Sequence, residues 1–149
     1  MAGSEQPTEF RLELEKLLAV PQKRVFAAFV DAEQLRHWWG PAGYTVSGLV
    51  FDPVEGASYR IDMQPPDGDV FHLCGTFRVV DAPRLVSFTF VYDEPDPDDQ
   101  ETLVTVTFEP RDPGTRVILD QGSFKTEARR ELHRRGWTDT LDRLEQWLG

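Results

Sequence analysis

The sequence predicts an α+β fold in which a curved antiparallel sheet of about seven strands wraps around one long C-terminal helix, with two short helices after the first strand. Three observations predict it. Apolar and polar residues alternate with a period of two over residues 10–15 and in several segments between 44 and 119. Turn signals separate those segments at intervals of about ten residues. Over residues 125–148 the apolar positions return instead at helical spacing.

Two short helices are predicted over residues 21–39, directly after the first strand. Pro21 suits the first turn of a helix, because a proline lacks the N–H that would be unpaired there. Asp31 is followed three residues later by Gln34, a spacing that resembles a capping box and predicts the start of a second helix. Gly40 and Pro41 then end it.

The middle of the chain is predicted to be an antiparallel meander. Strands alternate with turns, and the turns contain the residue types that favour tight reversals. The clearest turn segments are 52–56, 65–68, 81–83 and 112–114.

The C-terminal helix is predicted over about residues 125–148, roughly 24 residues and about 36 Å long. Its apolar positions form one face and are Leu132, Trp137, Leu141, Leu144 and Leu148. Gly136 lies inside this helix and should cost about 1 kcal/mol relative to alanine, so we expect it to permit close packing or a bend.

Composition narrows the possible functions. The chain has 149 residues and a formal net charge of −10, which disfavours binding to nucleic acid and to anionic membranes. One domain over residues 9–149 is expected, preceded by a disordered polar segment over residues 1–8. The N-terminal residues show no secretory signal and no stretch is long enough to span a membrane, so we expect a cytoplasmic protein.

Metal and cofactor chemistry lacks support in the sequence. There is one cysteine, Cys74, and there are three histidines, too few for the usual sets of zinc ligands. The motifs of nucleotide-binding proteins, serine hydrolases and zinc proteases are not found. We therefore expect no cofactor and no metal site, and we assign no catalytic residue.

A bent sheet and a single helix do not always fill the space between them, so this helix-grip arrangement predicts an apolar cavity. Inward positions of the strands and one face of the helix supply its walls. The candidate ligand-binding residues are Trp38, Trp39, Tyr59, Met63, Phe77, Phe88, Phe90, Val104, Val106, Phe108, His133, Trp137 and Leu141.

The order of elements also carries a family resemblance. The supporting segments are WWGP at 38–41, the stretches 46–63 and 75–90, and the final run 131–148. Together they resemble the helix-grip superfamily of START domains, polyketide cyclases and birch-pollen allergens, and within it the branch of the activator of Hsp90 ATPase. The resemblance covers about residues 8–149. It implies a ligand-binding fold with a central pocket, since members bind lipids, sterols, polyketides, hormones or antibiotics, and a few are enzymes.

Several candidates have a structural alternative that the sequence leaves open. Trp38 and Trp39 either wall the cavity or close the sheet as core residues. His133 and Trp137 are four residues apart and share a helix face, so His133 either points into the cavity or lies among the surface arginines of the helix. His72 and Cys74 are expected to point outward, because strand alternation turns Leu73 inward.

Charged residues are expected mainly at the surface. The basic cluster Arg129, Arg130, Arg134 and Arg135 is interpreted as a solvated helix face, with pairing to acidic residues of the chain or of a partner as the alternative. The acidic segment 93–101 is interpreted as a solvated hairpin loop. It holds six of the carboxylates, so the rest of the chain is only mildly acidic.

The favoured function is a binding module for a hydrophobic or aromatic small molecule, acting as a monomer or homodimer. One alternative is a protein-interaction module that contacts a chaperone, as in the Hsp90 co-chaperone branch. The other is an enzyme of the cyclase or hydrolase type that uses His133 as acid or base.

Overall fold

The computed structural model describes residues 10–149, so the predicted disorder of residues 1–8 lies outside the described residues. Seven strands form one antiparallel sheet in the order β2-β8-β7-β6-β5-β4-β3. The strands are β2 (Phe10–Leu18), β3 (Thr45–Val50), β4 (Ser58–Gln64), β5 (Phe71–Asp81), β6 (Leu85–Tyr92), β7 (Thr102–Arg111) and β8 (Gly114–Phe124).

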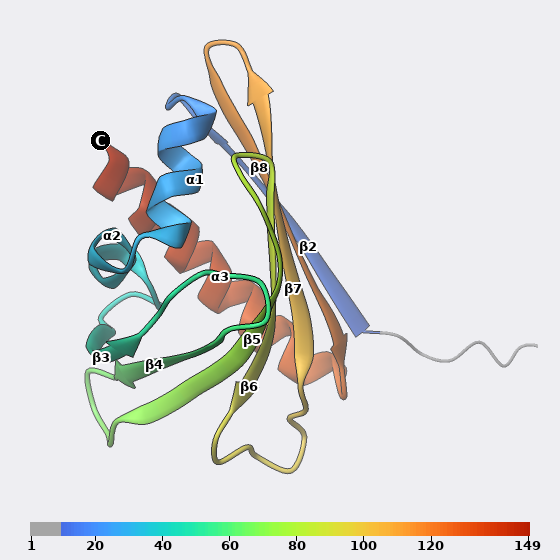
Figure 1. The fold of residues 1–149 in the computed structure, drawn as a ribbon. Helices are drawn as coiled ribbons and strands as arrows, with labels where there is room; N and C mark the ends of the chain where they lie inside the picture. Colours follow the sequence, from blue (N-terminus) through green and yellow to red (C-terminus); the bar gives the residue numbers. More distant parts are fainter. Residues whose placement is uncertain (1–9) are drawn as a thin grey trace, which may run out of the picture.

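Three helices lie on one side of this sheet (Figure 1). They are α1 (Gln22–Val30), α2 (Ala32–Trp38) and α3 (Glu127–Leu148). α3 packs against β2, β8 and α2, and α1 contacts β7 and β8. The predicted fold class is confirmed, with two short helices after the first strand and a long C-terminal helix held by a curved sheet.

Side-chain caps begin two of the helices. The Asp31 carboxylate accepts hydrogen bonds from the Glu33 backbone N–H at 3.0 Å and from Gln34 Nε2 at 3.1 Å. The predicted cap at Asp31 is therefore present, with Gln34 bonding to the side chain of Asp31. At the start of α3, the Thr126 hydroxyl accepts a hydrogen bond from the Arg129 N–H at 3.1 Å. Each cap satisfies a backbone donor that the helix itself cannot pair.

Strand alternation sets the two faces of β5 as predicted. Leu73 and Phe77 are buried beneath the helices, whereas the side chain of His72 is 38% exposed and lies 2.5 Å from Asp62 Oδ1. Gly75 occupies an inward position where a Cβ would lie 1.9 Å from the Thr89 carbonyl oxygen. Only glycine fits there, and the space admits the Tyr59 ring.

Aromatic side chains pack together in the core beneath α1 and α2. The ring centroids of Phe26 and Phe29 lie 5.2 and 5.1 Å from that of Phe108, and Trp38 is fully buried beside them. Across residues 10–149 no helix is both long and apolar enough to cross a membrane. The other end of the sheet, beneath the first half of α3, is less completely filled.

Candidate functional site

A cavity of about 360 Å³ lies between α3 and the strands β4, β5 and β6. The segment 39–44 forms one end of it, and the loop 93–101 between β6 and β7 forms the other. The walls are mostly apolar and aromatic, and a few polar groups converge on them, which is the usual composition of a small-molecule site. Its main apolar and aromatic lining residues are Trp39, Tyr44, Met63, Phe71, Leu73, Phe90, Tyr92, Leu132 and Trp137.

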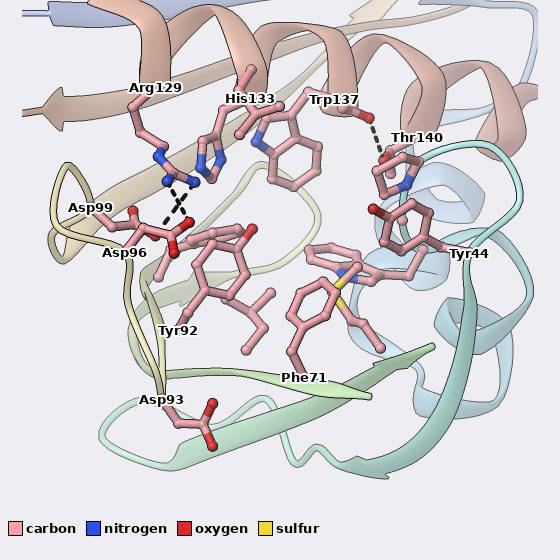
Figure 2. Close-up of a pocket in the computed structure, with 18 of the residues that line it drawn as sticks. Tyr44, Phe71, Tyr92, Asp93, Asp96, Asp99, Arg129, His133, Trp137 and Thr140 are labelled. Atoms are coloured by element: carbon pink, nitrogen blue, oxygen red, sulfur yellow. Dashed lines mark hydrogen bonds and ion pairs between the residues drawn. The ribbon is translucent and has the colours of Figure 1, made fainter. Parts of the chain in front are cut away.

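α3 presents four side chains with polar groups to this cavity, Arg129, His133, Trp137 and Thr140, beside the apolar Leu132. Their spacing of four, four and three residues places them on one face of an α-helix. Figure 2 shows these side chains projecting from α3 toward Tyr92 and the strands opposite. The helix thus supplies one row of polar groups, the loop 93–101 supplies carboxylates, and the strands supply a mainly apolar floor.

His133 is buried, with 7% of its surface exposed. Its ring packs among Phe90, Phe124 and Tyr92, with centroid distances of 5.4, 4.9 and 6.1 Å. Burial, with a smaller contribution from the Arg129 charge, lowers its pKa to about 4. The imidazole is therefore neutral near pH 7. It makes no hydrogen bond to any other part of residues 10–149, which leaves its polar edge available to a bound molecule.

The indole N–H of Trp137 already has a partner. It donates to Gln121 Oε1 at 2.7 Å, and Gln121 Nε2 donates to the Thr102 hydroxyl at 2.9 Å. Gln121 is fully buried, so it serves as a fixed support behind the indole. Trp137 thus offers its ring and not its N–H to the cavity, and it meets Trp39 edge-on at 5.2 Å between centroids.

The phenol of Tyr92 lines the cavity opposite α3 (Figure 2). Burial, reinforced by the nearby Asp99 carboxylate, raises the pKa of Tyr92 above its usual value. Its hydroxyl is therefore protonated at neutral pH and can donate a hydrogen bond. Together with the neutral imidazole of His133 it provides a donor and an acceptor at one end of the cavity.

Arg129 joins α3 to the acidic loop. Its Nη2 lies 2.9 Å from Asp96 Oδ2 and 2.7 Å from Asp98 Oδ1, and its Nη1 lies 3.6 Å from Asp99 Oδ2. Burial opposes its charge, but hydrogen bonds to Asp98 and Asp96 hold the guanidinium pKa above its usual value.

These contacts correct two predictions from the sequence. Arg129 belongs to a basic cluster that we interpreted as a solvated helix face, yet it is 8% exposed and paired with acidic residues of the chain. The segment 93–101 is not simply a solvated loop, because Asp99 has a side chain only 8% exposed and turned toward the same arginine. The acidic partners of Arg129 lie on a loop about 30 residues earlier in the chain. Tertiary packing brings this loop to the helix, and sequence spacing does not reveal that contact.

Five of the predicted ligand-binding residues line the cavity. They are Trp39, Met63, Phe90, His133 and Trp137. His133 thus faces the cavity, which excludes its alternative interpretation as a surface residue.

The other eight are placed outside this lining. Val104, Val106, Phe108 and Leu141 are sealed in the core, and the Trp38 indole N–H donates to the Ala28 carbonyl at 3.2 Å. Tyr59, Phe77 and Phe88 surround only a minor void of about 10 Å³. The physical reason is that α1 and α2 fill that end of the sheet, and an inward position does not distinguish filled space from open space.

Several lining residues are absent from the prediction. Tyr44 lies in a connection before a strand, Phe71 and Tyr92 lie at strand ends, and Thr140 is a polar residue on α3. The i, i+7 spacing of His133 and Thr140 is a signal that could have found the latter. Phe71 and Tyr92 carry no comparable signal. The face of the sheet on which an aromatic residue at a strand end lies depends on where the strand ends.

Comparisons with known proteins agree with this architecture. The family model described as activator of Hsp90 ATPase homolog 1-like protein matches residues 19–149. The crystal structure of the AHSA1 protein of Silicibacter pomeroyi is 30% identical, with a TM-score of 0.82 over 93% of this chain and 96% of that one. A Nitrosomonas europaea protein is 26% identical, with a TM-score of 0.78 over 96% and 97%. A Chromobacterium violaceum protein of 22% identity has a TM-score of 0.85 over 93% and 96%.

The helix held by a curved sheet, with a cavity between them, is the helix-grip fold. Within it, the chain belongs to the family of activator of Hsp90 ATPase homolog 1-like proteins. A comparison with curated proteins found no match.

Proposed function

We propose that the protein binds a small apolar or aromatic molecule in the cavity beneath α3, with one polar group of that molecule hydrogen-bonded to His133. The observation that carries the proposal is the neutral, buried imidazole without a hydrogen-bond partner in residues 10–149, placed in a cavity of about 360 Å³. An imidazole nitrogen that opens on the cavity can pair with a polar group of the ligand, which adds a hydrogen bond to the apolar contacts of the walls.

The aromatic lining supports a flat ligand body. Trp39 and Trp137 meet edge-on, and Phe71 meets Tyr44 and Tyr92 edge-on at 6.2 and 5.5 Å between centroids. Ring faces arranged in this way can stack on an aromatic molecule or enclose an aliphatic one. The fixed support from Gln121 to Trp137 means that this wall is preorganised, which lowers the entropic cost of binding.

The test uses two probes that share one apolar body, naphthylethanol and ethylnaphthalene, with affinities measured by calorimetric titration. The wild-type protein should bind both, and naphthylethanol should bind more tightly because its hydroxyl pairs with His133. His133→Phe keeps an aromatic ring but removes the hydrogen bond, so it should weaken naphthylethanol about tenfold and leave ethylnaphthalene unchanged.

A second variant tests the location. Leu132 lines the cavity and is 47% exposed, so Leu132→Trp should obstruct the mouth and weaken both probes. Leu17→Trp is the matched control, because Leu17 is 60% exposed and lies outside the lining. The proposal fails if neither probe binds, or if the Leu17 and Leu132 variants weaken binding equally.

A catalytic role for His133 is the second candidate, and its position inside the cavity is the observation that favours it. We rank it lower, because a pKa of about 4 makes the imidazole a weak base and hydrogen bonding requires no proton transfer. Contact with a chaperone, the other alternative, stays a prediction. A pull-down with an Hsp90-type chaperone tests it directly.

A further inference from the structure

The loop 93–101 carries more negative charge than its neighbours neutralise. Three of its carboxylates, on Asp96, Asp98 and Asp99, share the single guanidinium of Arg129. The nearby Lys125 donates to the Pro97 carbonyl at 2.9 Å. Glu94 forms no ion pair within residues 10–149 and lines the cavity. This side of the cavity is therefore negatively charged even after Arg129 is counted.

Among residues 10–149, Arg129 supplies the only fixed positive charge that faces the cavity. Arg129 is the only lysine or arginine among the described lining residues, and its charge is already shared among three carboxylates. His133 is neutral near pH 7 because burial lowers its pKa to about 4. Arg143 donates to the carbonyls of Trp39, Gly40 and Pro41 and is not among the lining residues. An anionic ligand would find no free cation here.

A second feature independently indicates that a polar ligand group belongs at this end. The His133 side chain is more than nine-tenths buried, lines the cavity and has no hydrogen-bond partner in residues 10–149. Figure 2 shows its ring between Arg129 and Trp137, on the side of the cavity where the acidic loop lies. A neutral imidazole nitrogen accepts a hydrogen bond from an N–H donor, and an ammonium is the strongest such donor.

The walls suit a cation as well. The side chains of Trp39, Trp137 and Tyr92 border the cavity, and the face of an aromatic ring attracts a positive charge placed over it. We propose that the ligand is a cationic one, an apolar or aromatic amine whose ammonium lies toward the loop 93–101 and donates to His133. This inference rests on the proposed function and adds the charge of the ligand to it.

Three probes of one apolar body test the inference at pH 7: naphthylethylamine, naphthylethanol and naphthylacetate. Affinity should fall in that order, with the amine binding about tenfold more tightly than the alcohol at low salt. Solvent weakens the attraction between the ammonium and the loop carboxylates but does not abolish it. Added salt should reduce the difference between amine and alcohol, because the charges lie near the surface.

Glu94→Gln combined with Asp96→Asn removes two charges from the loop while keeping an acceptor beside Arg129. This double variant should remove most of the preference for the amine over naphthylethanol. Asp52→Asn combined with Asp112→Asn is the matched control, since both residues are exposed and neither lines the cavity. It removes the same charge from the chain and should keep the preference.

The outcomes separate the two proposals. If naphthylethanol binds but the amine binds no more tightly, or if naphthylacetate binds best, the inference about charge is overturned and the proposed function stands. An amine preference lost equally in both double variants also overturns it, because net charge alone would then explain the effect. If none of the three probes binds, both proposals fail.

Discussion

His133 is the residue on which the site depends most. It lies on α3 with its ring among Phe90, Tyr92 and Phe124, and burial holds it neutral. Four arginines (Arg129, Arg130, Arg134 and Arg135) lie within four residues of it, which makes it look like a surface residue in the sequence. The structure shows instead that His133 belongs to the face of α3 that lines the cavity, together with Arg129, Trp137 and Thr140.

The lowered pKa of His133 predicts a pH dependence of stability. The unfolded chain binds a proton at His133 below about pH 6.5, whereas the folded chain resists it down to about pH 4. Stability from this group is therefore present above pH 6.5 and is lost as the pH falls toward 4, by up to about 3 kcal/mol. Urea unfolding at pH 7 and pH 4.5 should show a larger loss in the wild-type protein than in His133→Phe. Equal losses in the two proteins would contradict the assignment.

Gln121 is the second residue whose role can be isolated. It accepts from the Trp137 indole and donates to Thr102 in a fully buried setting. Gln121→Leu keeps the volume but leaves the indole N–H without its acceptor, so we expect a loss of about 1–3 kcal/mol in urea unfolding. Adding Trp137→Phe removes the stranded donor, and the double variant should lose less than the sum of the two single variants. Additive losses would show that the two side chains are not coupled.

At the scale of the element, the two halves of α3 have different roles. Its second half, with Leu141, Leu144 and Leu148, completes the core, while its first half borders the cavity and holds the acidic loop through Arg129. Gly136 lies at the junction and lines the cavity. The sequence led us to expect that Gly136 permits close packing or a bend. Its position indicates that the missing side chain keeps part of the cavity open.

Gly136→Ala tests that statement. A Cβ there would lie 3.6 Å from Pro41 Cγ, an ordinary contact, so the alanine fits and should stabilise the helix by about 1 kcal/mol. Its methyl group would also enter the cavity, so naphthylethanol should bind several-fold more weakly. Thr138→Ala is the control, because Thr138 is exposed on the outer face and its replacement should leave binding unchanged. A Gly136→Ala protein with increased stability and full affinity would contradict this role.

For the whole molecule, the sequence predicted the architecture well and the cavity only in part. Period-two alternation, turn residues and the helical repeat after residue 125 predict the seven strands and three helices, because each is a local signal. The position of the cavity depends on which end of the sheet α1 and α2 fill, a tertiary outcome. Phe108 and Phe90 both point inward, yet Phe108 packs against Phe26 whereas Phe90 lines the cavity.

The pairing of Arg129 with the loop is the other feature that sequence could not supply. An acidic run and a basic helix are both visible in the sequence, but only the sheet order brings the β6–β7 loop to the start of α3. The excess negative charge of the chain is thus concentrated beside its cavity. The expectation of one domain over residues 9–149 stays a prediction.

The most direct test of a ligand site beneath α3 uses the four tryptophans as position markers. In a ¹⁵N-labelled sample titrated with naphthylethanol, we expect the indole N–H signals of Trp39 and Trp137, which line the cavity, to shift saturably. The signals of Trp38, buried under α1, and Trp147, 41% exposed on the far end of α3, should stay in place. Shifts confined to Trp147, or no shift at any of the four at saturating probe, would contradict the site.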